Sequence, residues 1–99
     1  MSTETHVAKQ VIHDKIESQI NTVQAKLETL KAKAESAKAN AEIKLIADLL
    51  TKKLAIDQKL HELRKSDEGT WQKAKTDVES RVAELEKSVH AVEAKLKAA

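Results

Sequence analysis

The feature that most limits the fold of this chain is a series of apolar residues separated alternately by four and three positions. In the first half the series runs without interruption through Ile16, Ile20, Val23, Leu27, Leu30, Ala34, Ala37 and Ala41. A seven-residue repeat places its members on one face of an α-helix, where they form the seam of a coiled coil. The sequence therefore predicts a helix here that packs lengthwise against another helix.

The last third of the chain carries a second series with the same spacing. It runs through Trp71, Lys75, Val78, Val82, Leu85, Val89, Val92 and Leu96. Lys75 is its only polar member, so this segment is also expected to bury one face along its whole length. Two segments with one repeat predict two helices packed side by side.

The middle segment has a wider apolar face, and its repeat is out of phase with the first. Its seam runs through Ile46, Leu49, Lys53, Ile56, Leu60 and Leu63, and a second stripe beside it holds Ile43, Leu50 and Leu54. A helix with so wide an apolar face is expected to contact more than one neighbour. The polar seam residues, Lys53 and Lys75, are best interpreted as lysines that extend their amines to the helix-pair edge. Alternatively, these two lysines set the register of the helices or the oligomeric state.

The change of phase near residues 38–42 is compatible with two local structures. One is a stutter within a continuous helix. The other is a turn near residues 39–40, with Asn40 as N-cap and Glu42 in the first turn of the next helix. Because no glycine or proline occurs there, the local sequence favours the continuous helix.

The whole chain is thus predicted to be a single all-α domain, an elongated antiparallel coiled coil over residues 1–99. With no proline and one glycine, almost nothing in the chain forbids helix. In one arrangement, helices near 5–36, 40–65 and 69–97 form a three-helix bundle roughly 45 Å long. In the other, a helix of about 60 residues spans roughly 90 Å, and the last helix folds back on it as a hairpin. In this arrangement the last helix leaves the first half of the long helix uncovered, and that half forms a dimer with a second chain. The similar lengths of the three segments favour the bundle.

The chain's only glycine and only aromatic residue lie two positions apart, in the stretch SDEGTW. We expect a hinge here, near residues 65–70, that involves Ser66, Asp67 and Gly69. Ser66 or Asp67 ends one helix and caps the next, and an aspartate suits the positive end of a helix. Gly69 relaxes the first turn after the cap. Trp71 is expected to lie over Leu63 and Leu60 and close the hairpin.

Composition excludes several classes of function. Charged residues make up 34% of the chain, yet their net charge is only +2 and lysine and glutamate are interleaved. A nucleic-acid binder gathers basic residues on one face, so no specific nucleic-acid partner is expected. Cysteine is absent, which excludes disulfides and cysteine-based zinc sites and fits a cytoplasmic protein. The first residues lack the pattern of a secretory signal.

No pattern in the sequence indicates catalysis or a cofactor. A single glycine cannot form a phosphate-binding loop, and the carboxylates alternate with lysines along helix faces instead of pairing in a sheltered cleft. The four histidines form no His-x-x-x-His or Glu-x-x-His motif, so we expect them at the surface or at a seam edge, and we expect no metal site. With one aromatic residue the chain also lacks material for a ligand pocket. It is therefore predicted not to be an enzyme and to have no cofactor and no small-molecule substrate.

Four stretches of the chain form a distinctive order of motifs: Leu27-x-x-Leu30-Lys31-Ala32-Lys33-Ala34-Glu35, Ala37-x-Ala39-x-Ala41-x-Ile43-Lys44, Lys59-Leu60-x-x-Leu63 and Trp71-x-x-Ala74-Lys75-x-x-Val78-Glu79. With these motifs the chain resembles, over about residues 16–97, a family of small bacterial coiled-coil proteins from cyanobacteria and proteobacteria. The family has no assigned function and is often associated with stress. The resemblance implies no catalytic residue.

These observations predict a non-enzymatic structural or interaction protein, such as a bacterial stress-response or scaffold protein, that acts through protein–protein contacts. We expect it to self-associate as a homodimer or higher oligomer, or to bind partner helices. The alternative is a peripheral protein that binds anionic membrane surfaces through the amphipathic, lysine-flanked segment 43–56. Acidic residues on the polar face of that segment argue against the alternative.

Overall fold

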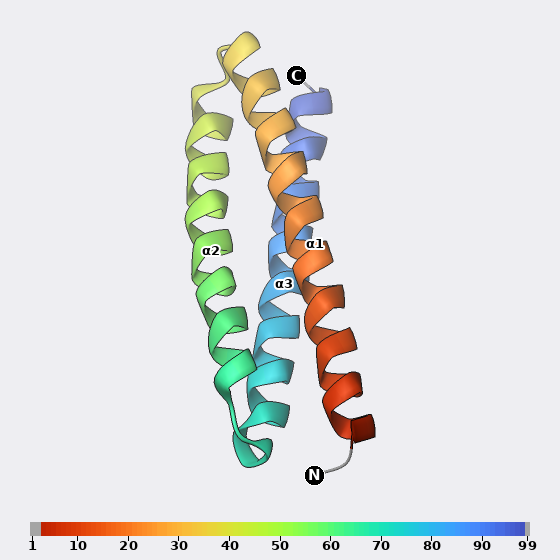
Figure 1. Cartoon of the computed structure of the whole chain (residues 1–99). Helices are drawn as coiled ribbons and strands as arrows, with labels where there is room; N and C mark the ends of the chain where they lie inside the picture. The colour runs from red at the N-terminus through yellow and green to blue at the C-terminus, as the bar shows by residue number, and fades with distance from the viewer. Residues whose placement is uncertain (1–2, 99) are drawn as a thin grey trace.

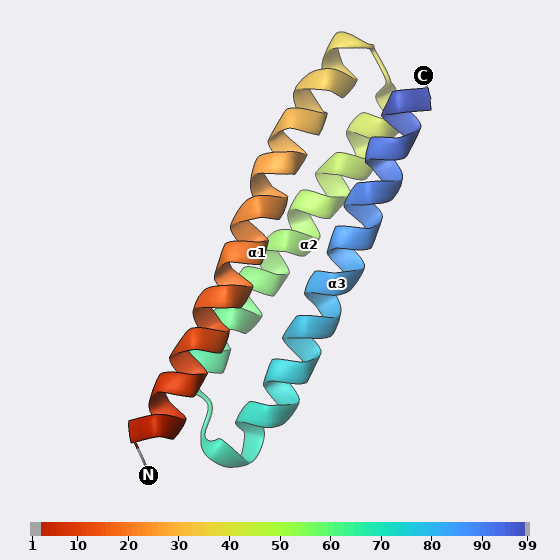
Figure 2. The same ribbon diagram turned by 90° about the vertical axis from the view of Figure 1, so that its right-hand side faces the viewer.

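In the part of the chain that the structure describes, the protein is a bundle of three long helices. The computed structural model describes the backbone of residues 3–98 and the side chains of residues 8–67 and 69–97. The helices are α1 (Thr3–Ser36), α2 (Asn40–Lys65) and α3 (Glu68–Ala98). They lie side by side with α2 antiparallel to both neighbours (Figures 1 and 2), and every pair is in contact. The all-α prediction is confirmed, and of the two arrangements the structure adopts the three-helix bundle.

The dimensions of the molecule follow from helix length. Its principal extents are 54 × 17 × 16 Å, and a helix of 34 residues such as α1 spans about 51 Å. The molecule is therefore one helix long and about two helices wide. The register between α2 and α3 is marked by an ion pair between Lys59 Nζ and Asp77 Oδ2, which are 3.7 Å apart.

The chain turns between Ser36 and Asn40, so the expectation of a continuous helix there is wrong. Lys38 has a φ of 56°, in the left-handed region. This conformation lets the Ala39 N–H donate to the Ala34 carbonyl at 2.9 Å and the Lys38 N–H donate to the Glu35 carbonyl at 3.1 Å. These two bonds form a Schellman motif, which satisfies carbonyls at the end of α1. The turn is thus closed by backbone hydrogen bonds, with a lysine at the position that glycine usually takes.

The start of α2 also differs from the prediction in one respect. Asn40 is the first residue of the helix, and Ala39 occupies the N-cap position without any side-chain hydrogen bond to the helix. The prediction that Asn40 is the N-cap is therefore wrong. Glu42 lies in the first turn, as expected, where its charge complements the positive end of the helix dipole.

The second turn is built by Ser66 and Asp67. Ser66 is the C-cap of α2, in an extended conformation. Asp67 is the N-cap of α3, because its Oδ1 accepts hydrogen bonds from the Thr70 N–H and the Thr70 hydroxyl, both at 3.0 Å. Gly69 lies in the first turn of α3 and not in the hinge itself, and no glycine has a positive φ. A Cβ at Gly69 would meet only Asp67 Oδ1, at an ordinary contact distance of 3.5 Å.

A single hydrophobic core runs between the three helices. It buries nearly all of the apolar seam residues, and Leu96 is partly buried against its end. The buried members are Ile16, Ile20, Val23, Leu27, Leu30, Ala34, Ile46, Leu49, Ile56, Leu60, Leu63, Trp71, Val78, Val82, Leu85, Val89 and Val92. Ala37 and Ala41, which continue the first seam in sequence, are exposed because the chain turns between them.

The two seam lysines reach the surface. Lys53 Nζ lies 2.7 Å from Asp57 Oδ2, and Lys75 Nζ lies 3.7 Å from Glu79 Oε1, each pair one helical turn apart. The aliphatic parts of both side chains are largely covered, whereas the ammonium groups meet carboxylates at the rim. This geometry supports the interpretation in which each lysine extends its amine to the edge of a helix pair.

Candidate functional site

A groove of about 300 Å³ lies at the end of the bundle where α2 turns into α3. It is bounded by the first part of α1 on one side and by the hinge on the other. Its lining consists of Lys9, Gln10, His13, Leu63, Arg64, Ser66 and Trp71. This groove combines the only aromatic residue of the chain with three side chains that carry or can carry positive charge.

Trp71 forms the apolar part of the groove and is 6% exposed. It lines the groove together with Leu63, next to which it was predicted to pack. Its ring is also approached from α1, because Lys9 Nζ lies 5.4 Å from the ring centroid, within the range of a cation–π interaction. The contact with α1 was not predicted, since the sequence pattern shows which face of a helix is apolar but not which third helix covers it.

The hinge beside the groove is held by the carboxylate of Asp67. Hydrogen bonds from the Thr70 backbone and hydroxyl lower the pKa of this carboxyl below its ordinary value, and the Gly69 N–H and the charge of Lys9 act in the same direction. The carboxylate therefore stays ionised at neutral pH, where it satisfies the first backbone N–H groups of α3. The same lysine that lies over Trp71 thus also favours the capping charge.

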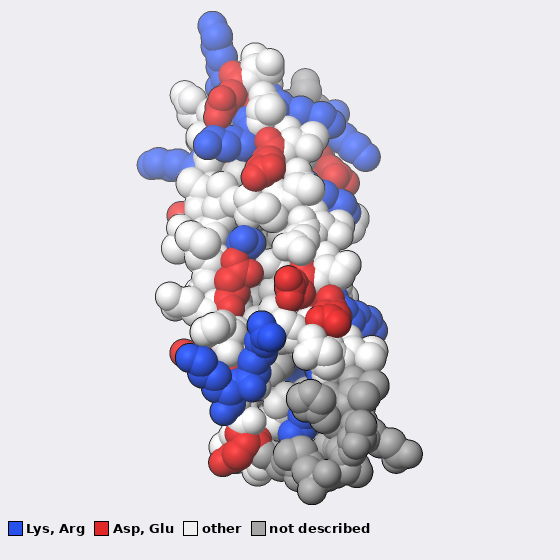
Figure 3. Space-filling view, in the orientation of Figure 1, with Lys and Arg blue, Asp and Glu red and all other residues white. Residues whose placement is uncertain are grey.

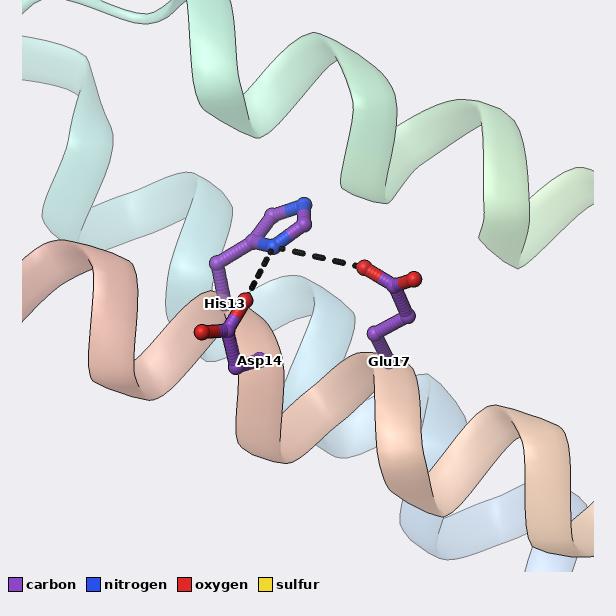
Figure 4. A group of neighbouring side chains, drawn as sticks. All are labelled: His13, Asp14 and Glu17. Carbon is purple, nitrogen blue, oxygen red and sulfur yellow. Dashed lines mark ion pairs between the residues drawn. The ribbon is translucent and has the colours of Figure 1, made fainter.

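His13 forms part of the groove wall and is 8% exposed. Its Nδ1 lies 3.5 Å from Asp14 Oδ1 and 3.6 Å from Glu17 Oε2, and all three residues belong to α1 (Figure 4). The ring extends from α1 into the space beside α2, whereas the two carboxylates remain exposed. Gln10 donates a hydrogen bond to Asp14 Oδ1 at 2.9 Å, which orients that carboxylate.

This cluster was missed by the sequence analysis, which expected no metal site. His13, Asp14 and Glu17 bring three potential ligand atoms within 4.8 Å of one another. The available signal was the spacing His-Asp-x-x-Glu, which sets a histidine and a glutamate one turn apart. Of the other histidines, His61 and His90 are exposed, and the side chain of His6 lies outside the described residues.

The remaining surface is mixed in charge. Figure 3 shows basic and acidic side chains alternating along one face of the bundle. The large apolar side chains that are clearly exposed stand singly, at Val11 on α1 and at Leu45 and Leu54 on α2. Exposed apolar residues that stand singly in this way are normal for folded domains and need no functional explanation. The hinge-end groove is therefore the most distinctive surface feature in the described part of the chain.

No family model, curated protein or solved structure matches this chain. Within residues 3–98, no helix is both long enough and apolar enough to cross a membrane. The function must therefore be inferred from the surface of the molecule itself.

Proposed function

We propose that this protein is a non-enzymatic cytoplasmic protein that acts through protein–protein contacts, and that the hinge-end groove is its contact site. The observation that carries the proposal is the combination of Trp71 with Arg64 and Lys9 around one concave surface. Tryptophan and arginine are the residue types that most often dominate the binding energy of protein interfaces. Arg64 is exposed and lies beside Trp71, which is only 6% exposed, so the arginine is the accessible anchor point of the groove.

The chemistry of the groove defines the kind of partner. Leu63 and Trp71 form the floor of the groove and are 1% and 6% exposed. Lys9 and Arg64 supply positive charge at its edge. Asp67, the nearby acid of the hinge, is engaged in capping α3. A segment of another protein that carries acidic side chains would complement this positive edge.

Self-association through the seams, as in the long-helix arrangement, is disfavoured by the burial pattern. The seam residues of all three helices already face one another within a single chain. A homodimer would have to use the outer faces, where only single apolar residues are exposed. A partner of different sequence at the groove is therefore favoured over a second copy. The resemblance to small bacterial coiled-coil proteins supports a scaffold role in stress response.

The membrane-binding alternative loses its main support. The apolar face of segment 43–56 was the proposed lipid contact, but Ile46, Leu49 and Ile56 from that face are buried in the core. Leu45 and Leu54 remain exposed, and they lie nine positions apart, which places them on opposite sides of a helix. Insertion into a lipid interface needs a continuous apolar face.

Trp71 fluorescence offers a direct test of the groove. We would titrate the full chain with a helical peptide of alternating Glu and Leu turns, and with a matched peptide in which lysine replaces each glutamate. The acidic peptide is expected to shift the emission and to bind in a saturable way. Arg64→Gln should weaken binding by about fivefold or more.

Arg81→Gln provides the matched control, because Arg81 lies on α3 and pairs with Asp77. This variant should bind the acidic peptide as the wild type does. Equal affinity for both peptides, or equal loss in both arginine variants, would contradict the proposed site. Sedimentation with vesicles of phosphatidylserine, together with the solution mass, tests the membrane and homodimer alternatives.

A further inference from the structure

One buried side-chain polar atom in the described part of the chain has no hydrogen-bond partner, namely Nδ1 of His13. Buried polar groups are nearly always satisfied, because leaving one without a partner is destabilising. The two carboxylates beside it, from Asp14 and Glu17, approach Nδ1 without bonding to it. An unpartnered imidazole nitrogen that faces two carboxylates is an arrangement that a cation would complete.

We propose that His13, Asp14 and Glu17 form a binding site for a divalent transition-metal ion, with Zn²⁺ as the best fit. The distances from Nδ1 to the two carboxylate oxygens are 3.5 and 3.6 Å. Tetrahedral zinc with bonds of about 2.0–2.1 Å separates adjacent ligand atoms by about 3.3–3.4 Å. A charge-assisted hydrogen bond between the same groups would instead be about 2.7–2.9 Å long. The two observed distances are thus close to the separation of adjacent ligand atoms in tetrahedral zinc, and they are longer than a hydrogen bond between the same groups.

The local structure holds the three side chains in place before any ion binds. His13 and Glu17 are one helical turn apart on α1, so their side chains project from the same face. The imidazole is fixed by burial beside α2 (Figure 4), while Gln10 holds the carboxylate of Asp14 through a 2.9 Å hydrogen bond. Outer partners of this kind orient metal ligands and tune their affinity.

The donor set selects the class of metal. One imidazole and two carboxylates suit zinc and similar ions, whereas calcium and magnesium prefer shells made of six or more oxygen ligands. Three protein ligands leave the fourth tetrahedral position for a water molecule or for an oxygen of a binding partner. With one protein ligand fewer than a structural zinc site, this site is expected to bind zinc more weakly than structural sites do.

Calorimetric titration of the full chain with zinc chloride at neutral pH tests the site. The wild type should bind one ion, and excess magnesium should not displace it. Asp14→Asn, Glu17→Gln and His13→Gln should each weaken binding by about tenfold or more. Because Asp14 and Glu17 are exposed, the first two variants are expected to fold normally, which circular dichroism would verify.

His90→Gln is the matched control. His90 Nδ1 lies 3.9 Å from Glu93 Oε1 on α3, but this histidine is exposed to solvent. Its replacement should leave the zinc affinity unchanged. As an independent readout, zinc should shift the Nδ1 resonance of His13 in the wild type and not in the Glu17→Gln variant.

The proposal is overturned if the wild type shows no saturable binding up to about 1 mM zinc. It is also overturned if Asp14→Asn or Glu17→Gln binds zinc like the wild type, or if His90→Gln weakens binding as much as they do. His13 lines the groove of the proposed protein contact, but the zinc site is tested at Asp14 and Glu17 and the protein contact at Arg64. Failure of either experiment would therefore leave the other unaffected.

Discussion

Replacing Lys38 with glycine is expected to stabilise the protein, because Lys38 holds a backbone conformation that favours glycine. Its φ is 56°, and the hydrogen bonds from Ala39 to Ala34 and from Lys38 to Glu35 require the chain to turn in this way. In the left-handed region the Cβ of an L-residue lies too close to the following carbonyl oxygen. Glycine has no Cβ and is the usual residue at this position of the motif.

The magnitude follows from two opposing terms. Relief of the left-handed conformation contributes roughly 1–2 kcal/mol, while the greater freedom of glycine in the unfolded chain removes roughly 0.4–1 kcal/mol. The middle of each range leaves a net gain in the free energy of unfolding of about 0.8 kcal/mol, which raises the Tm of a domain of this size by about 3–6 °C. The Lys38 side chain is exposed and forms no ion pair with the described residues, so its loss contributes little.

Thermal and urea unfolding followed by circular dichroism would measure the effect. Lys38→Ala is the control, because alanine removes the charge but keeps the Cβ and hence the conformational strain. The alanine variant should lie within about 0.5 kcal/mol of the wild type. The sign of the glycine effect also separates the two architectures. In a continuous helix glycine would destabilise by about 1 kcal/mol relative to alanine, so a lower Tm for Lys38→Gly than for Lys38→Ala would refute the turn.

Three further predictions concern the hinge and the core. Gly69→Ala should stabilise the protein by about 0.5–1 kcal/mol in urea unfolding, because Gly69 is helical and the added Cβ fits at 3.5 Å from Asp67 Oδ1. A loss of stability would show that the first turn of α3 cannot accept a side chain. Leu27→Ala should lower the free energy of unfolding by about 2–5 kcal/mol, since Leu27 is 0% exposed at the centre of the core. Leu54→Ala, at a residue 62% exposed, should change it by about 0.5 kcal/mol or less. The contribution of the Asp67 cap to the free energy of unfolding should be fully present above pH 3.8, the ordinary pKa of this carboxyl. It should be lost as the pH falls through the lower pKa of the folded state. The Tm difference between wild type and Asp67→Ala should therefore shrink in acid, and a difference independent of pH would contradict the role of the charge.

The residues of the core could be predicted because apolar residues recur along the sequence with a regular seven-residue repeat. A seven-residue repeat specifies which face of each helix is apolar, and residues such as Leu27, Val82 and Leu85 are buried because they lie on that face. The end of α1 was not predictable in the same way. Neither Lys38 nor its neighbours is a residue that usually ends a helix. The turn is instead favoured by the burial it permits, since α2 must reverse direction to bring Ile46 and Leu49 into the core.

The groove depends on information that a single helical repeat does not contain. The sequence pattern placed Trp71 at the start of the last seam and next to Leu63, and both line the groove. Lys9 also approaches the Trp71 ring. This contact depends on the relative lengths of α1 and α2, because they bring the start of α1 to the hinge. The burial of His13 was easier to predict from the sequence than the Lys9 contact. His13 lies three positions before Ile16 and so continues the first seam backward.

A polar residue within a seam has a different structural consequence when it is a lysine than when it is a histidine. Three polar residues in the seams are each followed, four positions later, by an acid: Lys53 with Asp57, Lys75 with Glu79, and His13 with Glu17. A lysine has a long flexible stem, so its ammonium group reaches the rim, where its carboxylate partner and water satisfy it. The imidazole is short and rigid, so Nδ1 of His13 stays buried and does not form a hydrogen bond with its acid. An ion placed between the histidine and the carboxylates would supply the missing interaction. For this reason we place the metal site at His13 and not at either lysine.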